Sequence, residues 1–261
     1  MGDEVFISII TVSYNSGATI GRTIESILKQ DFKDYEYIIQ DGGSIDNTRE
    51  IINKYESSFD GRVKTYFEPD EGIYDAMNKA IKKAKGKYIW LVNADDYISD
   101  NALRYIFDYC KKQNFKECII SGRMNVFDAE TSRIKFVSSQ GAYDEYTDKC
   151  RKLKMGICHP ATIVHKNIYQ RLGLYDARYY ISADIDFCLR AYEAGVLVEF
   201  PSVILTNMSD GGISNKFPLR KNMHDCKLRA SKFCRSFPHR MYYITWYFFR
   251  LLYLKFYGYR Y

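Results

Sequence analysis

Proline and glycine are scarce in this chain. Its 261 residues include 5 prolines and 16 glycines, which excludes a collagen-like or low-complexity protein. The seven cysteines form no Cys-x-x-Cys pair and no zinc-ligand spacing, and their odd number predicts reduced thiols in a cytosol. No basic segment opens the sequence, so we expect no signal peptide.

The composition also excludes a disordered chain. Hydrophobic residues make up 46% of the sequence and charged residues 27%, which is enough apolar surface to build a core.

The net charge of +6 is unevenly distributed along the chain, because residues 216–261 contain 11 Lys and Arg but only one acid. The remainder has 27 basic and 31 acidic residues. This mildly acidic part does not predict a nucleic-acid partner.

Apolar runs alternate with helical patterns over the first 110 residues. Strands are predicted at residues 5–12, 35–40, 63–67 and 87–92, and helices follow at 19–28, 46–55, 72–85 and 101–112. Such alternation with short connections predicts right-handed βαβ units and a parallel sheet covered on both faces. In these sheets, ligands bind at the carboxyl ends of the strands.

The pattern becomes mixed beyond residue 118. We expect strands at 118–121, 134–137, 161–165, 196–200 and 202–207, and a helix at 185–194. No linker divides the chain, so the sequence predicts one catalytic domain, residues 1–215, followed by an extension, residues 216–261.

Three polar clusters follow predicted strands. They are residues 13–15, 41–44 and 93–96, and together they predict a site at one sheet edge. In the last cluster Asp95 and Asp96 are adjacent carboxylates, which suit a Mg²⁺ or Mn²⁺ ion carrying phosphate oxygens. A helix-capping pair ahead of residue 101 is an equal alternative.

The second cluster, Asp41-Gly42-Gly43-Ser44, allows two interpretations as well. Its glycines would let a ligand approach the backbone, and Asp41 could accept hydrogen bonds from a base or ribose. The alternative is a turn with a helix cap.

Four motifs in order resemble glycosyltransferase family 2. They are Thr11-Val12-Ser13-Tyr14-Asn15, residues 41–48, residues 68–79 and Asn93-Ala94-Asp95-Asp96. Residues 182–190 resemble the acidic motif of the family, although many members have Glu-Asp where this chain has Ala183-Asp184. The resemblance covers about residues 5–215 and implies a GT-A fold. In that α/β fold a Rossmann-like nucleotide-sugar-binding half, here residues 1–100, is fused to an acceptor-binding half, here 101–215.

The resemblance implies a role for each motif residue. Asp96 would bind a divalent cation (Mg or Mn) with help from Asp95, which could instead contact the ribose. A nucleotide-sugar donor, with UDP favoured, would lie against the remaining donor-binding residues, which are Thr11, Val12, Ser13, Tyr14, Asp41, Gly43 and Asp70. Asp70 could equally belong to an acidic turn. An inverting transfer needs one general base, and Asp184 is the candidate.

His159 and the loop at residues 211–214 each allow a functional and a structural interpretation, whereas Asp186 is expected to be structural. His159 could line the acceptor pocket or be a structural histidine. The loop with Gly211, Gly212 and Ser214 could close over the donor or be a surface turn. Asp186 is expected to be a residue of the helix N-terminus rather than a second base.

The extension combines basic and aromatic residues. Residues 221–235 predict a basic amphipathic helix, Pro238 interrupts it, and residues 241–261 are rich in Tyr, Trp, Phe and Arg. The last segment is too short and too charged for a comfortable span, and its composition is typical of the membrane–water interface. We therefore expect contact with an anionic membrane surface, and the alternative is a helix that packs on the domain or in a homodimer.

The leading hypothesis is an inverting, metal-dependent glycosyltransferase. The family resemblance suggests that it adds one sugar to a lipid-linked saccharide acceptor in bacterial capsule, exopolysaccharide or O-antigen assembly. It would lie at the inner face of the cytoplasmic membrane. The alternatives are a nucleotidyltransferase acting on a sugar phosphate, which should show a Gly-rich loop after Val12 that is not there, and a non-catalytic nucleotide- or sugar-binding module.

Overall fold

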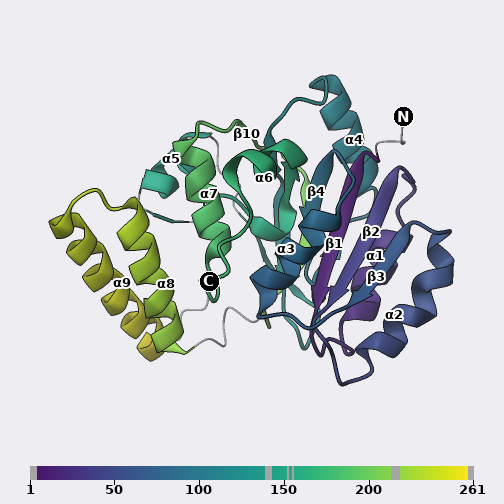
Figure 1. The fold of residues 1–261 in the computed structure, drawn as a ribbon, viewed down its shortest axis with the longest axis horizontal. Helices are drawn as coiled ribbons and strands as arrows, with labels where there is room; N and C mark the ends of the chain where they lie inside the picture. Colours follow the sequence, from purple (N-terminus) through teal and green to yellow (C-terminus); the bar gives the residue numbers. More distant parts are fainter. Residues whose placement is uncertain (1–4, 139–142, 152, 155, 213–217, 258–261) are drawn as a thin grey trace.

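A seven-stranded sheet forms the centre of the computed structural model, which describes residues 5–138, 143–151, 153–154, 156–212 and 218–257. The strand order is β10-β6-β9-β4-β1-β2-β3 (Figure 1). The strands are β1 (Ile7–Ser13), β2 (Tyr35–Asp41), β3 (Val63–Phe67), β4 (Tyr88–Leu91), β6 (Ile119–Ser121), β9 (Thr162–His165) and β10 (Val198–Glu199). Only β9 runs antiparallel to its neighbours, so the predicted mostly parallel sheet is confirmed.

Helices cover both faces of this sheet. One face packs against α1 (Ile20–Leu28), α2 (Thr48–Glu56) and α4 (Ala102–Lys112). The other packs against α3 (Ile73–Lys83), α6 (Lys166–Leu172) and α7 (Ala183–Glu193). Because successive strand residues point to opposite faces, Ile10 and Ile89 join the second core, whereas Ile9 and Trp90 join the first. Strands buried on both faces are continuously apolar, which is why the sequence revealed them.

A smaller sheet lies beyond the carboxyl end of β4. It has the order β5-β11-β7-β8 and consists of β5 (Tyr97–Ile98), β11 (Ile204–Ser209), β7 (Arg123–Phe127) and β8 (Ile134–Val137). Two short 3-10 helices, η1 (Ser57–Phe59) and η2 (His159–Ala161), and α5 (Tyr143–Arg151) complete the part of the chain before the extension. The pairing of β11 with β5 brings Ser209 next to the loop that follows β4.

The extension forms two helices, α8 (Leu219–Phe233) and α9 (Phe237–Tyr257). Figure 1 shows α8 beside α7, with α9 on the outer side. Cys226, Ala230 and Tyr243 belong to the same core cluster as the buried face of α7, so α8 is part of the packed structure. Pro238 does not lie between two helices, as the sequence suggested, but in the first turn of α9, where its missing N–H has no helical partner to lose.

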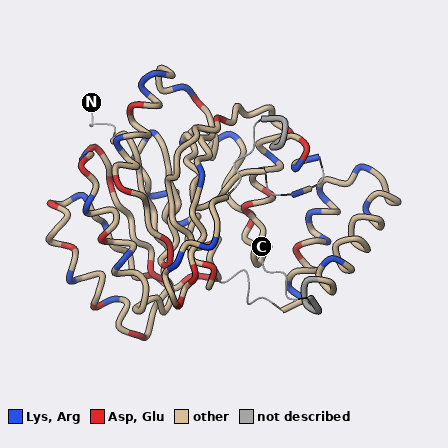
Figure 2. The backbone as a smooth tube through the Cα atoms, turned by 180° about the vertical axis from the view of Figure 1, so that it is seen from behind, with Lys and Arg blue, Asp and Glu red and all other residues tan. Residues whose placement is uncertain are grey.

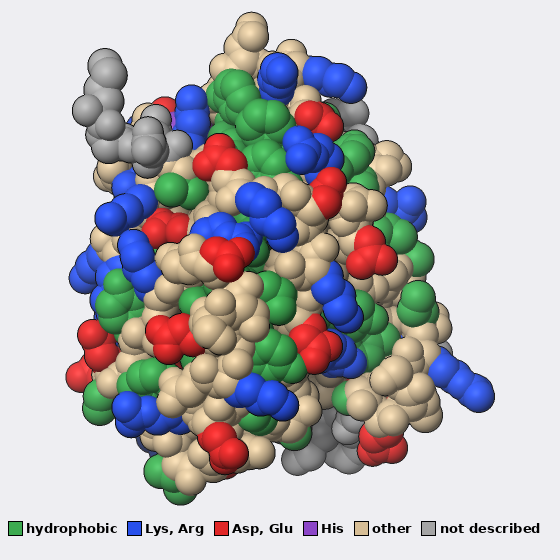
Figure 3. Space-filling view, turned by 90° about the vertical axis from the view of Figure 1, so that its right-hand side faces the viewer, with side chains coloured by type: hydrophobic (Ala, Val, Ile, Leu, Met, Phe, Trp, Pro, Cys, Tyr) green, Lys and Arg blue, Asp and Glu red, His purple; other side chains and the backbone are tan. Residues whose placement is uncertain are grey.

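The sheet reverses its direction of winding next to β1. From β1 the chain proceeds to β2 and β3 on one side, and it then returns to place β4 on the other side. Such a switch point opens a crevice at the carboxyl ends of the two central strands. Figure 2 shows acidic segments gathered at this lower edge of the sheet. On the face that includes β3 and α2, by contrast, charges of both signs are interspersed (Figure 3).

Gly86, just before β4, provides a test of this packing. A Cβ atom there would lie 2.3 Å from the backbone nitrogen of Ser8 and 2.6 Å from the carbonyl carbon of Ile7. We expect Gly86→Ala to lower the free energy of unfolding by about 2 kcal/mol or more, because β1 cannot move without disturbing the sheet. Urea unfolding measures this loss.

Gly21→Ala is the matched control. Its Cβ would meet only Ile51 Cγ2, at 3.8 Å. We therefore expect no loss of stability and a gain of up to about 1 kcal/mol, because Gly21 lies in α1 and alanine favours a helix more than glycine does. Equal stability of the two variants would show that β1 and the α3–β4 connection are not packed as described.

Candidate active site

Acidic side chains meet where the central strands end. The register pairs Ser13, the last residue of β1, with Asp41, the last residue of β2. The Ser13 hydroxyl donates a 2.8 Å hydrogen bond to Asp41 Oδ2, and the N–H of Glu68, just after β3, donates to the carbonyl oxygen of Asp41 (3.0 Å). Three strand ends are therefore joined at Asp41.

The Asp41 carboxylate organises the turn that follows it. Oδ1 accepts hydrogen bonds from the N–H groups of Gly43 (3.1 Å) and Ser44 (2.8 Å), and Oδ2 accepts one from the Ser44 hydroxyl (2.6 Å). Asp41 is 1% exposed, and Gly43 has a φ of 91°, which glycine adopts readily. The turn interpretation thus describes the contacts of this side chain, and recognition of a base by Asp41 stays a prediction.

Asp70 lies directly against this turn. A Cβ on Gly42 would be 2.1 Å from Asp70 Oδ2, so only a glycine at position 42 leaves the carboxylate where it is. Burial raises the pKa of Asp70, and the Asp75 and Asp41 carboxylates raise it further, while the Gly72 N–H at 2.9 Å lowers it. The loops after β2 and β3 therefore present two carboxylates side by side.

Asp95 and Asp96 lie in the loop after β4. Asp96 is 1% exposed. Its Oδ1 accepts from the Ser209 N–H (3.0 Å), and its Oδ2 accepts from Asn93 Nδ2 (3.3 Å). Burial raises the pKa of Asp96 well above its ordinary value, and the neighbouring Asp95 raises it further. A cation beside this pair would relieve that penalty.

Asp95 is the more exposed carboxylate of the pair. A Cβ on Gly212 would lie 3.9 Å from Asp95 Oδ2, so the turn after β11, which also contains Gly211, lies beside it. The carbonyl oxygen of Asp95 accepts from Arg22 Nη2 (3.0 Å). No sequence motif pointed to Arg22, whose guanidinium lies 4.5 Å from the centre of the Phe127 ring. Ser214 lies outside the described residues.

Asp184 lies in the first turn of α7 and faces a small cavity. Its Oδ1 accepts from its neighbour's N–H (2.8 Å, Ile185) and from the Tyr74 hydroxyl of α3 (3.4 Å). The cavity extends from Asp184 to Leu91, the last residue of β4, and is lined by Leu91, Ile157, His159, Thr162, Val164, Tyr169, Tyr175, Asp184 and Phe187. The end of β4 thus lines the Asp184 cavity through Leu91 and continues into the loop that contains Asp95 and Asp96.

His159 lines this cavity, and its role toward an acceptor stays a prediction. Its Nε2 lies 3.3 Å from the Tyr175 hydroxyl, which is itself 3.3 Å from the Tyr169 hydroxyl. The sequence pattern did not single out either tyrosine as a cavity residue, because an isolated aromatic residue has the same pattern in a core and in a pocket.

The residues of the motif Thr11-Val12-Ser13-Tyr14-Asn15 differ in how exposed their side chains are. Thr11 and Val12 are buried in β1, and Thr11 Oγ1 accepts a 3.0 Å hydrogen bond from the Tyr37 hydroxyl. Tyr14, just past the strand, is 62% exposed. Any contact of Thr11 or Val12 with a donor would therefore involve the backbone.

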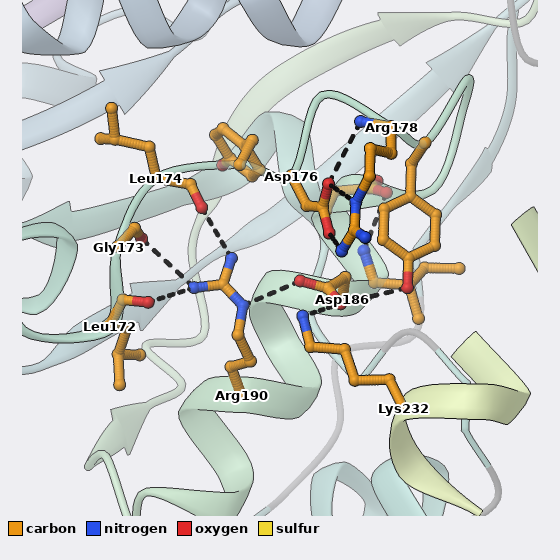
Figure 4. A network of polar contacts seen from close by, with 12 residues as sticks. Leu172, Gly173, Leu174, Asp176, Arg178, Asp186, Arg190 and Lys232 are labelled. Carbon is orange, nitrogen blue, oxygen red and sulfur yellow. Dashed lines mark hydrogen bonds and ion pairs between the residues drawn. The ribbon is translucent and has the colours of Figure 1, made fainter. Parts of the chain in front are cut away.

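The carboxylate of Asp186 is buried and bound by polar side chains of the fold. Its fully buried carboxylate binds Arg190 (2.8 Å), Lys232 (2.6 Å) and the Tyr179 hydroxyl (3.2 Å), as Figure 4 shows for the two cations. Because these partners occupy both oxygens, Asp186 is not available as a second base.

Comparison with known proteins agrees with this architecture. The profile described as "Glycosyl transferase family 2" matches residues 8–173. A PGL/p-HBAD biosynthesis glycosyltransferase of Mycobacterium tuberculosis is 29% identical over 213 residues, which cover 80% of this chain and 78% of that protein. The chondroitin synthase of Pasteurella multocida is 35% identical over 120 residues, 46% of this chain and 12% of the synthase.

Two solved structures share the fold. S. aureus TarS 1–349 in complex with UDP-GlcNAc has a TM-score of 0.69 at 18% identity and covers 93% of this chain and 71% of its own. The mannosyltransferase PcManGT from Pyrobaculum calidifontis, in complex with GDP-Man and Mn²⁺, has a TM-score of 0.61 at 14% identity, covering 92% of this chain and 68% of its own.

The fold is that of the GT-A glycosyltransferases. The family match extends over more than half of the sequence. The chain therefore belongs to glycosyl transferase family 2.

The environment of His159 predicts a pH dependence of stability. Burial lowers its pKa from the ordinary 6.5, although the Asp184 carboxylate opposes this shift. The unfolded chain therefore takes up the proton at a higher pH than the folded protein, and stability decreases as the pH falls below 6.5. For one proton the loss is at most about 1.4 kcal/mol per pH unit.

We expect His159→Gln, which keeps a polar atom near Tyr175, to lose less stability than the wild type between pH 7.5 and 5.5. Urea unfolding at both pH values measures the difference. Parallel losses in the two proteins would contradict a depressed His159 pKa.

Proposed function

We propose that this glycosyltransferase moves one sugar, with inversion, from a nucleotide-sugar donor to a hydroxyl of a saccharide acceptor. The observation that carries the proposal is the connection between the four carboxylates at the switch point and the carboxylate of Asp184. Asp41, Asp70, Asp95 and Asp96 gather at the switch point, and the cavity beside Asp184 begins at the strand that leads to Asp95. A donor at the switch point would place its sugar toward Asp184.

A divalent cation, Mg²⁺ or Mn²⁺, suits the Asp95–Asp96 pair. The described residues contain no group of three or more His, Cys, Asp or Glu that could bind a metal by themselves. Such a set is not needed, because Mg²⁺ is commonly bound by one or two carboxylates together with substrate phosphates. When bound, the ion would neutralise the charge that develops on a departing nucleoside diphosphate. The Mn²⁺ in the PcManGT complex supports this part of the proposal.

Asp184 is the proposed general base. The acceptor oxygen attacks the anomeric carbon from the face opposite the diphosphate, the bond from that carbon to the diphosphate oxygen breaks, and the hydroxyl proton passes to Asp184. A single carboxylate is enough for this displacement. The neighbouring Tyr74 hydroxyl, 3.4 Å from Asp184 Oδ1, helps to orient the base.

The donor is a nucleoside diphosphate sugar, with UDP favoured. Complexes of related folds with UDP-GlcNAc and with GDP-Man support this class. The acceptor in this proposal is a lipid-linked saccharide of a bacterial surface polysaccharide, and the similarity to a bacterial glycosyltransferase of PGL/p-HBAD biosynthesis supports a biosynthetic role.

Asp184→Asn tests the proposed reaction. We expect turnover to fall about 10²- to 10⁴-fold, because the acceptor proton loses its base. Nucleotide-sugar affinity should not change. A UDP- or GDP-sugar at 100 times its Kd should stabilise wild type and variant alike by about 2.7 kcal/mol in the presence of Mn²⁺, measured by thermal shift.

A chelator provides the control, and we expect it to reduce the thermal shift in both proteins. Full turnover of the variant would contradict the role of Asp184. Absence of a shift with UDP-, GDP- and dTDP-sugars would contradict a nucleotide-sugar donor.

We further propose that α9 binds the inner face of the cytoplasmic membrane. Among the described helices, none combines the length and apolar character needed to cross a bilayer. The outer side of α9 nevertheless exposes a stripe of large apolar residues, Phe237, Met241, Tyr242, Phe248, Phe249 and Tyr253. Exposed Arg235, His239 and Arg250 lie beside it, and such a mixture favours anionic lipid.

Vesicle sedimentation tests this surface. The double variant Tyr242→Ser/Phe249→Ser removes side chains that are 70% and 62% exposed. We expect it to lose at least about tenfold in binding to phosphatidylglycerol vesicles, because each aromatic side chain contributes about 1.5–3 kcal/mol when buried. Activity on a short soluble acceptor should remain.

Tyr105→Ser on α4, 39% exposed, is the matched control and should bind normally. Equal vesicle binding by the double variant and the wild type would contradict the membrane proposal. So would a wild-type dimer that the double variant converts to a monomer, since a second copy would then cover the stripe.

A further inference from the structure

Two buried charged residues of α8 have no part in the reaction described above. Asp225 and Arg229 are each 1% exposed, and their spacing of four residues places them on the same side of the helix. A buried charge is strongly unfavourable unless polar partners surround it. The hydrogen-bond partners of Asp225 and Arg229 therefore indicate which part of the fold the two residues hold in place.

Asp225 binds the segment that leads into α7. Its Oδ1 accepts from the N–H of Tyr180 (2.9 Å), and its Oδ2 accepts from the N–H of Ile181 (2.8 Å) and from the Ser182 hydroxyl (3.0 Å). His224 Nδ1 also lies 3.3 Å from Oδ1. One carboxylate thus fixes three consecutive residues that end two positions before Asp184.

Arg229 contacts the same serine hydroxyl as Asp225 does. Its Nη1 donates to Ser182 Oγ, and its Nη2 donates to the Tyr243 hydroxyl of α9 (3.4 Å). The hydroxyl of Ser182 has one proton, which goes to Asp225, and its oxygen accepts from Arg229. Ser182 is the N-cap residue of α7 but makes no side-chain cap, because its hydroxyl joins the two charges of α8 instead.

A third contact from α8 lies on the other side of Asp184. Lys232 Nζ is 2.6 Å from Asp186 Oδ1, and the same carboxylate binds Arg190, which in turn donates to the carbonyl oxygens of Leu172 and Leu174 (Figure 4). Residues 180–182 and residue 186 are therefore all anchored to α8. Asp184 lies between these anchors.

We infer that Asp225 and Arg229 are positioning residues that set the place of Asp184 through Ser182. The side chain of Asp184 has weak restraints of its own: a 3.4 Å contact with Tyr74 and a hydrogen bond to its neighbour's N–H. Its position therefore follows the backbone at the start of α7, which α8 determines. Displacement of a reacting group by about 1 Å can cost about 100-fold in rate. This inference rests on the proposed role of Asp184 as the base.

Ser182→Ala tests the inference, because it removes the shared hydroxyl with little change in volume. We expect kcat to fall about 10- to 100-fold while the Kd of the nucleotide sugar stays the same. Introduced into Asp184→Asn, the same change should cause no further loss, because a residue that acts only through Asp184 has nothing left to position. Ser231→Ala, an exposed serine of α8, is the matched control and should leave kcat unchanged.

Asp225→Asn provides an independent variant, for which we expect the same pattern. Unchanged kcat in Ser182→Ala would overturn the inference. So would an equal loss of kcat in the wild-type and Asp184→Asn backgrounds, or a loss of donor binding together with turnover, since either would assign Ser182 to the stability of the fold. Full activity of Asp184→Asn alone would be a different failure, because it would refute the proposed base and remove the premise of this inference.

Discussion

Negative charge concentrated at the switch point is the constraint on which the rest of the site depends. Asp41, Asp70, Asp95 and Asp96 are all carried there by the ends of β2, β3 and β4. Burial and neighbouring carboxylates raise the pKa of both Asp70 and Asp96, so this arrangement is unfavourable in the isolated protein. The fold tolerates it through local hydrogen-bond donors, such as Ser13 and the Ser209 N–H. A cation bound with a diphosphate would turn the same penalty into binding free energy.

The C-terminal helices connect this site with the outer surface. Asp225 and Arg229 of α8 contact the start of α7, Arg229 contacts Tyr243 of α9, and Tyr243 donates in turn to the carbonyl oxygen of Leu153 (3.3 Å). The opposite side of α9 exposes its aromatic stripe. One continuous set of contacts thus runs from the start of α7, which carries the proposed base, to α9, which carries the proposed membrane surface.

The sequence predicted the parallel sheet well, because strands buried on both faces are continuously apolar; β3 was placed at residues 63–67 without error. It missed β7, a five-residue strand that alternates polar and apolar residues and lacks the continuous apolar run of the buried strands. It also missed α6, which has only seven residues. The carboxylate clusters could be predicted because parallel strands bring their ends to one edge. The contacts of Asp225 and Arg229 could not, because Ser182 is more than 40 residues away in the chain. The family profile and the GT-A neighbours confirm the predicted family and fold, whereas the roles of the individual site residues stay predictions.

The metal site at the end of β4 is tested by a crystal structure of the protein with Mn²⁺ and UDP, with data collected at the manganese absorption edge. We expect one anomalous peak at the carboxylates of Asp95 and Asp96, with the diphosphate next to the metal and the uridine toward Asp41. Nucleotide bound with the metal at any other group, or with these two carboxylates turned away from the diphosphate, would contradict it.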